Sequence, residues 1–522
     1  MKLIAKKIVL SACTSLLLIF AWPPSSINFL LLIAFVPLLI VTFDEDGPQK
    51  VFLYFYFSLQ LFLLEMHLPL LIEGRHIMPL VVGLIFVPAF WCCPILVSTL
   101  IKKRYGLEFA LIAFPFLYVS QEIGQYYWDF AVTWFHLGLG LSNTPFLLGV
   151  NPYLGQEGGS LLVLLSNVSF YYLYIQHREN QLRRIHFLPI SFFCLIVLFF
   201  NFIQPQKEAK TKADIAIFQP SSKENRAVEN DLRGQYDLLE NAIVQSGFKK
   251  ADLLICPESY FFDMKKYPLI VNNLKQHLAI KKLMELSQKY ETPIFAGAVL
   301  VEFYYTKDPP TASAKKRGQG DYYDIYNGSI FITPDGQVSW RTKQSLVPFT
   351  EIIPFHAFFN FLERNGLWPT RYIDTYGTVE FEGPYEYGKL KIAPAICFES
   401  LFPHVMASYI QKKANLQVVL STDWTGSQSL NQQQQDGMLV DVYSFGRPLV
   451  FATLNQNSTI TNRGKRTVFS HKDFDVKSVD INIWSGYYTI VGVKPWYWIV
   501  FTLAVIFGIL LVHKKTWIRG SK

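Results

Sequence analysis

Charged residues are scarce in this sequence, and their scarcity points to its broad class. They make up 17% of the 522 residues, whereas hydrophobic residues make up 51%. Soluble globular domains carry about 25% charged residues, so this composition favours a membrane protein. The net charge of +8 comes from short basic clusters between apolar segments. That distribution argues against a nucleic-acid partner, which needs a surface of interleaved basic and aromatic residues.

The sequence also lacks the patterns of metal and cofactor sites. It has no glycine-rich phosphate loop and no internal repeat. Its six cysteines have no spacing typical of a zinc site or a disulfide framework, and most lie in apolar segments where packing explains them. We therefore expect no metal and no cofactor. The cysteines are Cys13, Cys92, Cys93, Cys194, Cys256 and Cys397.

Long apolar runs, in contrast, are abundant. Eight segments are candidates for membrane-spanning helices, because several approach the ~20 residues that cross a bilayer. The first resembles a signal peptide, but Trp22-Pro23-Pro24 stands where a small-residue cleavage site would be, so we expect an uncleaved helix. The segments are residues 8–20, 29–43, 51–64, 78–100, 107–119, 161–175, 187–203 and 496–512.

The basic clusters give a topology for these segments. With eight crossings and a cytoplasmic N-terminus, every cluster falls on the cytoplasmic side, as the positive-inside rule requires. The same count places residues 204–492 outside the membrane. The clusters are Lys6-Lys7, Lys102-Lys103-Arg104, Arg178 with Arg183-Arg184, and Lys514-Lys515 with Arg519.

Three domains follow from these patterns. Residues 1–203 are predicted to form a membrane domain of about seven helices, and residues 493–522 a last membrane helix with a cytoplasmic tail. Between them, residues 204–492 alternate between strand and helix patterns, which indicates an α/β domain. We expect a helix at about 271–290 and a loose polar loop at 311–320. The aromatic loop 121–158 is suited to the membrane interface or to a lipid entrance.

Three short stretches carry side chains suited to acyl chemistry. Cys397 ends a buried-strand pattern at 390–396, and a thiol at a strand end near a carboxylate can serve as a nucleophile. Glu258 follows the apolar run LLICP, and such a setting raises the pKa of a carboxyl group toward that of a useful base. Lys343 follows a hairpin pattern, and its charge suits an oxyanion. Taken singly, each residue has a more common explanation. Cys397 would be a small side chain packed in the core, Glu258 a carboxylate that faces water, and Lys343 a solvated lysine.

In chain order, Glu258, Lys343 and Cys397 resemble the triad of the nitrilase, or carbon–nitrogen hydrolase, superfamily. The string K-x-x-L-V-P-F-x-E from Lys343 to Glu351 and the Cys-Phe-Glu string at 397–399 are closer still to the apolipoprotein N-acyltransferase family. So is the position of the α/β domain between membrane helices. The resemblance covers nearly the whole chain and implies a multi-pass α-helical membrane domain plus an extracytoplasmic αββα sandwich of the nitrilase type.

The resemblance also implies a reaction. Cys397 would take an acyl chain from a phospholipid as a thioester and pass it to the N-terminal amine of an S-diacylglyceryl-cysteine apolipoprotein, in a ping-pong scheme. Glu258 would act as the base, and Lys343 would supply the charge for the oxyanion. The protein would lie in a bacterial inner membrane, with a periplasmic catalytic domain and cytoplasmic termini.

Neighbouring residues extend the resemblance and also limit it. Glu351 and Glu399 match two further acidic positions of the family and are implied to orient Lys343 and the loops around the thiol; a structural salt bridge is the alternative. Phe398 stands where the family usually has tyrosine, so a hydroxyl group is missing. Other departures concern substrate choice and rate but spare the triad. They are Ser421, Thr422, Thr425, Asp441, Ser444 and Gln456.

The stretch 351–369 carries more large apolar side chains than an ordinary loop. We expect a lid that dips into the outer leaflet and admits an acyl chain, because an exposed apolar patch suits a membrane surface. The alternative is an insertion that packs on its own domain. The membrane-facing residues of this predicted lid are Phe355, Phe358, Phe359 and Trp368.

Two other functions compete with acyl transfer. A membrane-tethered amidase of the nitrilase type would use the same residues to hydrolyse a small amide, but it has no need of eight helices and an aromatic lid. A non-catalytic membrane protein that binds lipoproteins would not need an intact set of Glu258, Lys343 and Cys397. We therefore expect the transferase.

Overall fold

The computed structural model describes residues 2–45, 47–73, 77–129, 131–204, 207–355, 358, 375–380, 382–422, 428–454, 457–462, 465–469, 474–484 and 497–508. Phe359, Trp368, Gln456 and residues 423–426 therefore lie outside the described residues. Internal contacts divide the chain into two units. The first comprises Met1–Pro205, Ser429–Ser444 and Gly486–Lys522, and the second Gln206–Gln428 and Phe445–Ser485.

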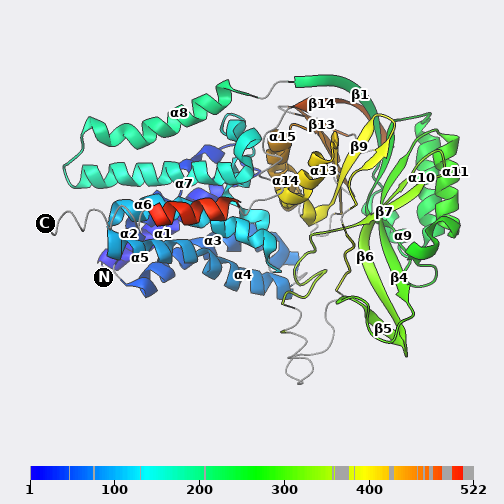
Figure 1. Cartoon of the computed structure of the whole chain (residues 1–522), viewed down its shortest axis with the longest axis horizontal. Coiled ribbons are helices and arrows are strands. Elements are labelled where there is room, and N and C mark those ends of the chain that lie inside the picture. The colour runs from blue at the N-terminus through cyan, green and yellow to red at the C-terminus, as the bar shows by residue number, and fades with distance from the viewer. Residues whose placement is uncertain are drawn as a thin grey trace. The chain divides into compact units, whose positions relative to one another are not determined.

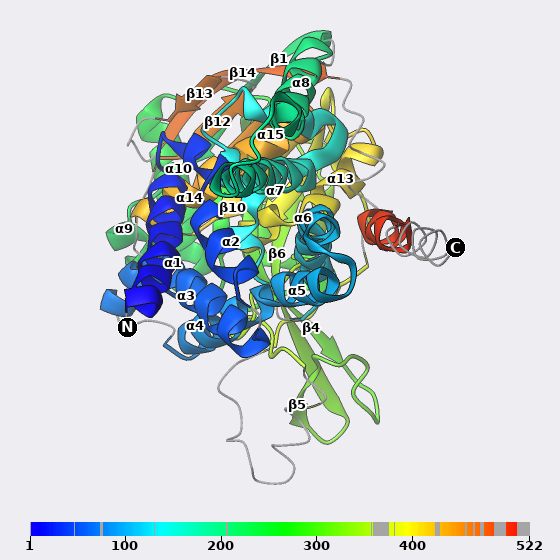
Figure 2. The same cartoon turned by 90° about the vertical axis from the view of Figure 1, so that its left-hand side faces the viewer.

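The first unit is built from apolar helices. Figure 2 shows α1 beside α2 and α3, and these helices contact one another. Segments that are apolar all round form helices that bury one side against each other and leave the other side to lipid. The helices are α1 Lys2–Ala21, α2 Val36–Phe43, α3 Pro48–Glu73, α4 Ile77–Trp91, α5 Cys93–Tyr105, α6 Leu107–Gly124, α7 Asn151–Arg178 and α8 Leu188–Phe202.

Six helical segments of the described residues are long and apolar enough to cross a membrane, and each coincides with a predicted segment. Two more, Asn28–Phe43 and Tyr497–Gly508, are apolar but shorter. The first of these is broken, because a 3-10 turn at Asn28–Leu32 precedes α2. The membrane character is thus confirmed, and the count of eight crossings stays a prediction. The six segments are Ile4–Ala21, Pro48–Leu68, Gly83–Tyr105, Leu107–Tyr127, Leu147–Arg178 and Arg184–Phe202.

The predicted loop 121–158 is much shorter than expected and mostly buried. Helix α6 continues to Gly124 and α7 begins at Asn151, with 3-10 turns between them. Phe135 packs against Phe62 with ring centroids 5.6 Å apart, and against Trp22 and Trp91. Phe135 and Tyr126 are thus buried inside the first unit, whereas Tyr127 is 57% exposed. The interface or lipid-entrance role of this loop stays a prediction.

The second unit contains two β-sheets. The larger has the order β14-β1-β2-β4-β6-β5, with β3 on β4 and β7 on β6, and the smaller the order β13-β12-β11-β10-β9-β8. Central strands β1, β2 and β4 pair in parallel, as do β9, β10 and β11. The strands are β1 Lys207–Phe218, β2 Leu253–Phe261, β3 Leu269–Ile270, β4 Ile294–Tyr304, β5 Lys315–Gly318, β6 Asp321–Ile332, β7 Val338–Thr342, β8 Tyr385–Tyr387, β9 Leu390–Ile396, β10 Leu416–Ser421, β11 Leu449–Thr453, β12 Thr459–Asn462, β13 Lys465–Val468 and β14 Phe474–Trp484.

The sheets face each other across an apolar core. Along β1, Ile215 and Ile217 enter the core between the sheets, whereas Ala216 and Phe218 enter a second core under the helices. This alternation follows from the two-residue period of a strand and explains why the strands are apolar on both faces. Helices α10 (Leu232–Ser246) and α11 (Leu278–Lys289) cover the outer face of the large sheet (Figure 1).

Helix α13 (Pro403–Gln411) packs on β9 of the smaller sheet. Helices, two sheets and a helix thus form the layers of the predicted αββα sandwich. Helices α14 (Gln428–Gly437) and α15 (Leu439–Phe445) come later in the chain. By their contacts, residues Ser429–Ser444, which include Asp441 and Ser444, belong to the first unit.

Three details differ from the sequence prediction. The expected loop 311–320 contains strand β5, which escaped notice because its Lys-Lys-Arg-Gly sequence is that of a polar edge strand. The helix expected at 271–290 begins at Leu278, after a 3-10 turn at Val271–Gln276. Strand β14 was not predicted, although it pairs with β1 along its length.

Candidate active site

Cys397 lies where strand β9 ends and a 3-10 turn, Cys397–Leu401, begins. Its φ of +51° lies in the left-handed region, which costs a non-glycine residue about 1–3 kcal/mol. The Ser400 hydroxyl donates to the Cys397 carbonyl at 2.7 Å and helps to hold the turn. The thiol is 4% exposed, so it leaves the strand at a sharp, buried corner.

Glu258 lies in an irregular part of β2. The pairing of β2 with β4 shifts register between Cys256 and Phe261, and Ser259 has a φ of +49°. Gly297 on β4 makes room for this bulge, because a Cβ there would lie 2.4 Å from the Pro257 carbonyl oxygen. A bulge of this kind re-aims a side chain, and here it directs the Glu258 carboxylate into the buried site.

Lys343 follows directly on β7 and is almost completely buried. Its side chain is 1% exposed, and its ammonium nitrogen lies 2.9 Å from the Glu351 carboxylate and 3.8 Å from Glu258 Oε1. Glu351 also accepts the Val347 N–H at 2.8 Å. A buried cation that meets two carboxylates at these distances is fixed by them, so the alternative of a solvated lysine is wrong for this structure.

Two donors that the sequence analysis missed hold the carboxylates. The Asn327 side-chain amide donates to Glu258 Oε1 at 2.9 Å and to Glu351 Oε1 at 2.8 Å. The Thr422 backbone N–H donates to Glu258 Oε2 at 3.0 Å. An asparagine inside an apolar strand was a signal for the first, since a buried amide needs partners. A backbone donor such as Thr422 leaves no mark in a sequence.

Glu399 connects the lysine loop with the nucleophile. Its Oε1 accepts the Gln344 N–H at 2.6 Å, and its Oε2 accepts the Ile396 N–H at 2.9 Å. These donors flank Lys343 on one side and Cys397 on the other. The carboxylate therefore contacts the backbone of both segments and makes no salt bridge within the described residues. Its orienting role stays a prediction.

The electrostatics of the site favour a protonated thiol and a basic carboxylate. The pKa of the Cys397 thiol is raised to about 12, chiefly by burial and then by the Glu258 charge, whereas Lys343 acts to lower it. Burial also raises the pKa of Glu258 above its ordinary value, against Lys343 and hydrogen bonds from Asn327 and Cys397 that lower it. Burial alone would lower the pKa of Lys343, but Glu351 and Glu258 hold it above its usual value. A thiol with so high a pKa needs a base before it can attack.

The remaining predicted residues lie at the edges of this cluster or beyond it. Phe398 is buried, and its ring packs edge-on against Phe402 at 5.2 Å. Phe355 and Phe358 are 42% and 57% exposed, as a membrane-facing patch requires. Phe359 and Trp368 lie outside the described residues, so the lid stays a prediction.

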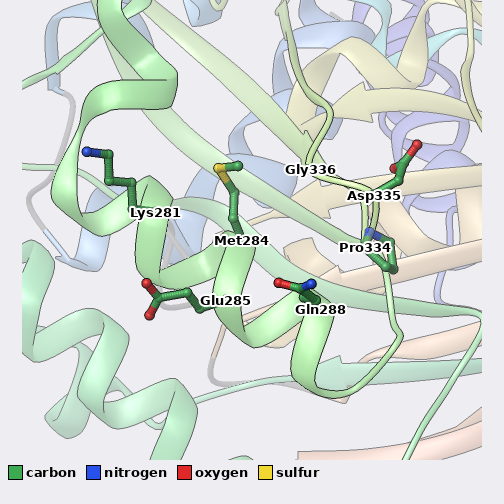
Figure 3. Close-up of a pocket in the computed structure, with 7 residues that line it drawn as sticks. All are labelled: Lys281, Met284, Glu285, Gln288, Pro334, Asp335 and Gly336. Carbon is green, nitrogen blue, oxygen red and sulfur yellow. The ribbon is translucent and has the colours of Figure 1, made fainter.

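A separate pocket of about 360 Å³ lies between α11 and the turn that joins β6 to β7 (Figure 3). Its lining mixes polar side chains with Met284 and Pro334, and it includes none of the residues of the Glu258, Lys343 and Cys397 cluster. It is lined by Lys281, Met284, Glu285, Gln288, Pro334, Asp335 and Gly336.

Comparison with known proteins agrees with this architecture. Residues 14–169 match the family model "Apolipoprotein N-acyltransferase N-terminal domain", and residues 214–440 match "Carbon-nitrogen hydrolase". An apolipoprotein N-acyltransferase of Chlorobaculum tepidum is 23% identical over 78% of this chain and 76% of its own length. One of Geobacter metallireducens is 23% identical over 87% of this chain and 85% of its own.

Among solved structures, the Caenorhabditis elegans NitFhit protein is similar, with a TM-score of 0.36 and 19% identity over 56% of this chain and 65% of that one. The family evidence comes from the sequence matches. Two family models cover consecutive parts of the chain in the order in which the helices and the sandwich occur. Relatives of one name span most of its length. On this ground, the chain belongs to the apolipoprotein N-acyltransferase family.

Proposed function

We propose that this protein transfers a fatty acyl chain from a phospholipid to the N-terminal amine of an S-diacylglyceryl-cysteine apolipoprotein, the last step of lipoprotein maturation. The observation that carries the proposal is the buried set of Glu258, Lys343 and Glu351 beside a cysteine at a strand end. The family membership supplies the substrate class, and the site supplies the chemistry.

The first half-reaction loads the cysteine. Glu258 takes the thiol proton as the Cys397 sulfur attacks the ester carbonyl of the phospholipid, and Lys343 stabilises the oxyanion that forms. When the tetrahedral intermediate collapses, the C–O bond breaks and protonated Glu258 gives its proton to the departing lysophospholipid oxygen. The product is a thioester on Cys397, with every proton accounted for.

The second half-reaction transfers the acyl group from Cys397 to the acceptor. The apolipoprotein amine attacks the thioester, Glu258 takes the amine proton, and the C–S bond breaks. The amide product leaves, and the proton returns to the Cys397 sulfur. Glu351 and Glu399 do not touch the reacting atoms in this scheme. They hold Lys343 and the adjoining backbone through the contacts described above.

We further propose an inner-membrane location with the sandwich in the periplasm and both termini in the cytoplasm. The basic residues at the end of α5 support this topology, because Lys102, Lys103 and Arg104 occupy its last turn. In functional terms, we assign 1–203 to the membrane domain, 204–492 to the catalytic domain and 493–522 to the last helix and tail. We also propose that Phe355 and Phe358 belong to a lipid-facing lid, since both are exposed apolar rings on a segment adjoining Glu351.

One experiment tests the reaction. The full chain is incubated in phospholipid nanodiscs, and its peptides are analysed by mass spectrometry before and after addition of a diacylated lipopeptide. We expect an acyl adduct on Cys397 that disappears as the peptide amine becomes acylated. An adduct resolved only by water would indicate an amidase-like hydrolase, and no adduct in any lipid would refute acyl transfer through this cysteine.

A further inference from the structure

Asn327 occupies a central position among the charged groups of the site. It lies in β6 and is 3% exposed. A primary amide has two N–H donors, and Asn327 directs them to Glu258 Oε1 at 2.9 Å and Glu351 Oε1 at 2.8 Å. Carboxylate oxygens can only accept, so the amide must turn its nitrogen toward them.

The backbone of Asn327 holds the third charged group. Its carbonyl accepts the Lys343 N–H at 2.9 Å, which continues the antiparallel register in which Gly328 pairs with Thr342. The side chain therefore positions two carboxylates while the main chain positions the lysine between them. No other residue in the described part of the second unit hydrogen-bonds to all three.

The site needs a neutral donor at this point. Two carboxylates share one ammonium group, so one negative charge is uncompensated in a buried environment. Glu351 lies 2.9 Å from the Lys343 nitrogen and Glu258 3.8 Å, which leaves Glu258 the freer of the two. A neutral amide that donates to both relieves their repulsion without adding charge, and its hydrogen bond favours the ionised form of Glu258.

We propose that Asn327 is a positioning residue that keeps Glu258 ionised and turned toward the Cys397 thiol while Glu351 stays on Lys343. This assignment rests on the proposed function, because it concerns the base of that reaction. Asn327 touches no reacting atom and acts through Glu258.

The test is the pH dependence of Cys397 alkylation by iodoacetamide, read peptide by peptide in the full chain. Alkylation requires that the Cys397 thiol and the Glu258 carboxyl hold only one proton between them, so that the sulfur can react as a thiolate. Replacing Asn327 by leucine removes the hydrogen bonds to both carboxylates at similar side-chain volume. The pKa of Glu258 should then rise, so we expect the acidic limb of the N327L profile, where the alkylation rate climbs with pH, to move up by about one to two pH units. Asn415→Leu is the matched control, since Asn415 also makes hydrogen bonds at 2.8 and 2.9 Å but lies away from the site; its limb should stay unchanged.

A second variant covers the case in which N327L does not fold. Asn327→Asp keeps the shape and adds a third carboxylate, so its limb should move up even further. An unchanged limb in either folded variant would overturn the proposal. The alkylation readout needs no lipid substrate, so it is independent of the proposed function. Absence of an acyl adduct in the wild type would refute the transferase, whereas an unshifted acidic limb would refute only the positioning role proposed for Asn327.

Discussion

Replacing Lys343 by methionine tests whether the buried charge cluster works as described. The side chains of Lys343, Glu258 and Glu351 are 1%, 7% and 10% exposed, so little solvent screens them. Removing one partner of a buried ion pair costs about 3–5 kcal/mol, because the remaining charge is uncompensated. We expect K343M to lose about that much free energy of unfolding near neutral pH.

The loss should depend on pH in a defined direction. Without the ammonium group, the folded-state pKa of Glu258, which burial already raises, moves further above its unfolded value. The folded protein then binds more protons than the unfolded one, so the stability of K343M falls as the pH rises through this window and recovers as the pH falls. Chemical denaturation at several pH values measures this.

The same variant should lose acylation. Loss of one oxyanion-stabilising donor costs about 10²–10³-fold in rate, which single-turnover formation of acyl-Cys397 in nanodiscs would show. Lys391→Met is the control, because Lys391 pairs with Glu386 at 3.0 Å on an exposed surface, where a pair is worth about 0–1 kcal/mol. If K343M acylated Cys397 at the wild-type rate, or were as stable as K391M, the reasoning about this cluster would be refuted.

Three further predictions follow from single contacts. In Glu399→Gln, one carboxylate oxygen becomes an NH2 group, which must face the N–H of Gln344 or Ile396 and cannot accept from it. We therefore expect a loss of about 1–3 kcal/mol in the free energy of unfolding together with slower acylation. A thermal melt like that of the wild type would contradict this. Gly297→Ala puts a Cβ 2.4 Å from the Pro257 oxygen and should cost about 1–3 kcal/mol and displace Glu258, whereas Gly318→Ala, with its nearest neighbour at 3.8 Å, should be silent in both denaturation and acylation. A spin label at Phe358 should show immersion in bilayers by collision with lipid-soluble oxygen, unlike a label at the exposed Val244 of α10; equal, water-like accessibility at both positions would argue against the lid.

Much of the element content could be predicted from the sequence, because long apolar runs indicated the membrane helices and shorter apolar runs, such as 213–219, indicated strands. The αββα arrangement followed from the family resemblance, since no local pattern shows that Ile215 and Ala216 enter two different cores. The polar edge strand β5 was missed, since its lysines give no apolar period. The aromatic composition of the segment 121–158 suits both a membrane interface and a helix-bundle interior, and only packing in three dimensions shows that a ring such as Phe135 is buried.

The site was readable to a similar extent. Glu258, Lys343 and Cys397 lie far apart in the chain and were linked through family strings; geometry then brought the carboxylates and the lysine to within 3.8 Å. What the strings could not give is the support around them. Asn327 and the Thr422 N–H become partners of Glu258 only through strand register and the fold of the loops. Such contacts depend on three-dimensional placement that no local pattern encodes.

The most direct measurement is a chase of the acyl-enzyme. Wild-type protein and Cys397→Ala are loaded from isotope-labelled phospholipid, separated from free lipid and mixed with a diacylated lipopeptide. Labelled acyl groups should move from Cys397 of the wild type to the peptide amine, and C397A should carry and transfer none. Transfer by C397A, or a labelled Cys397 that never passes its acyl chain to the peptide, would contradict the account.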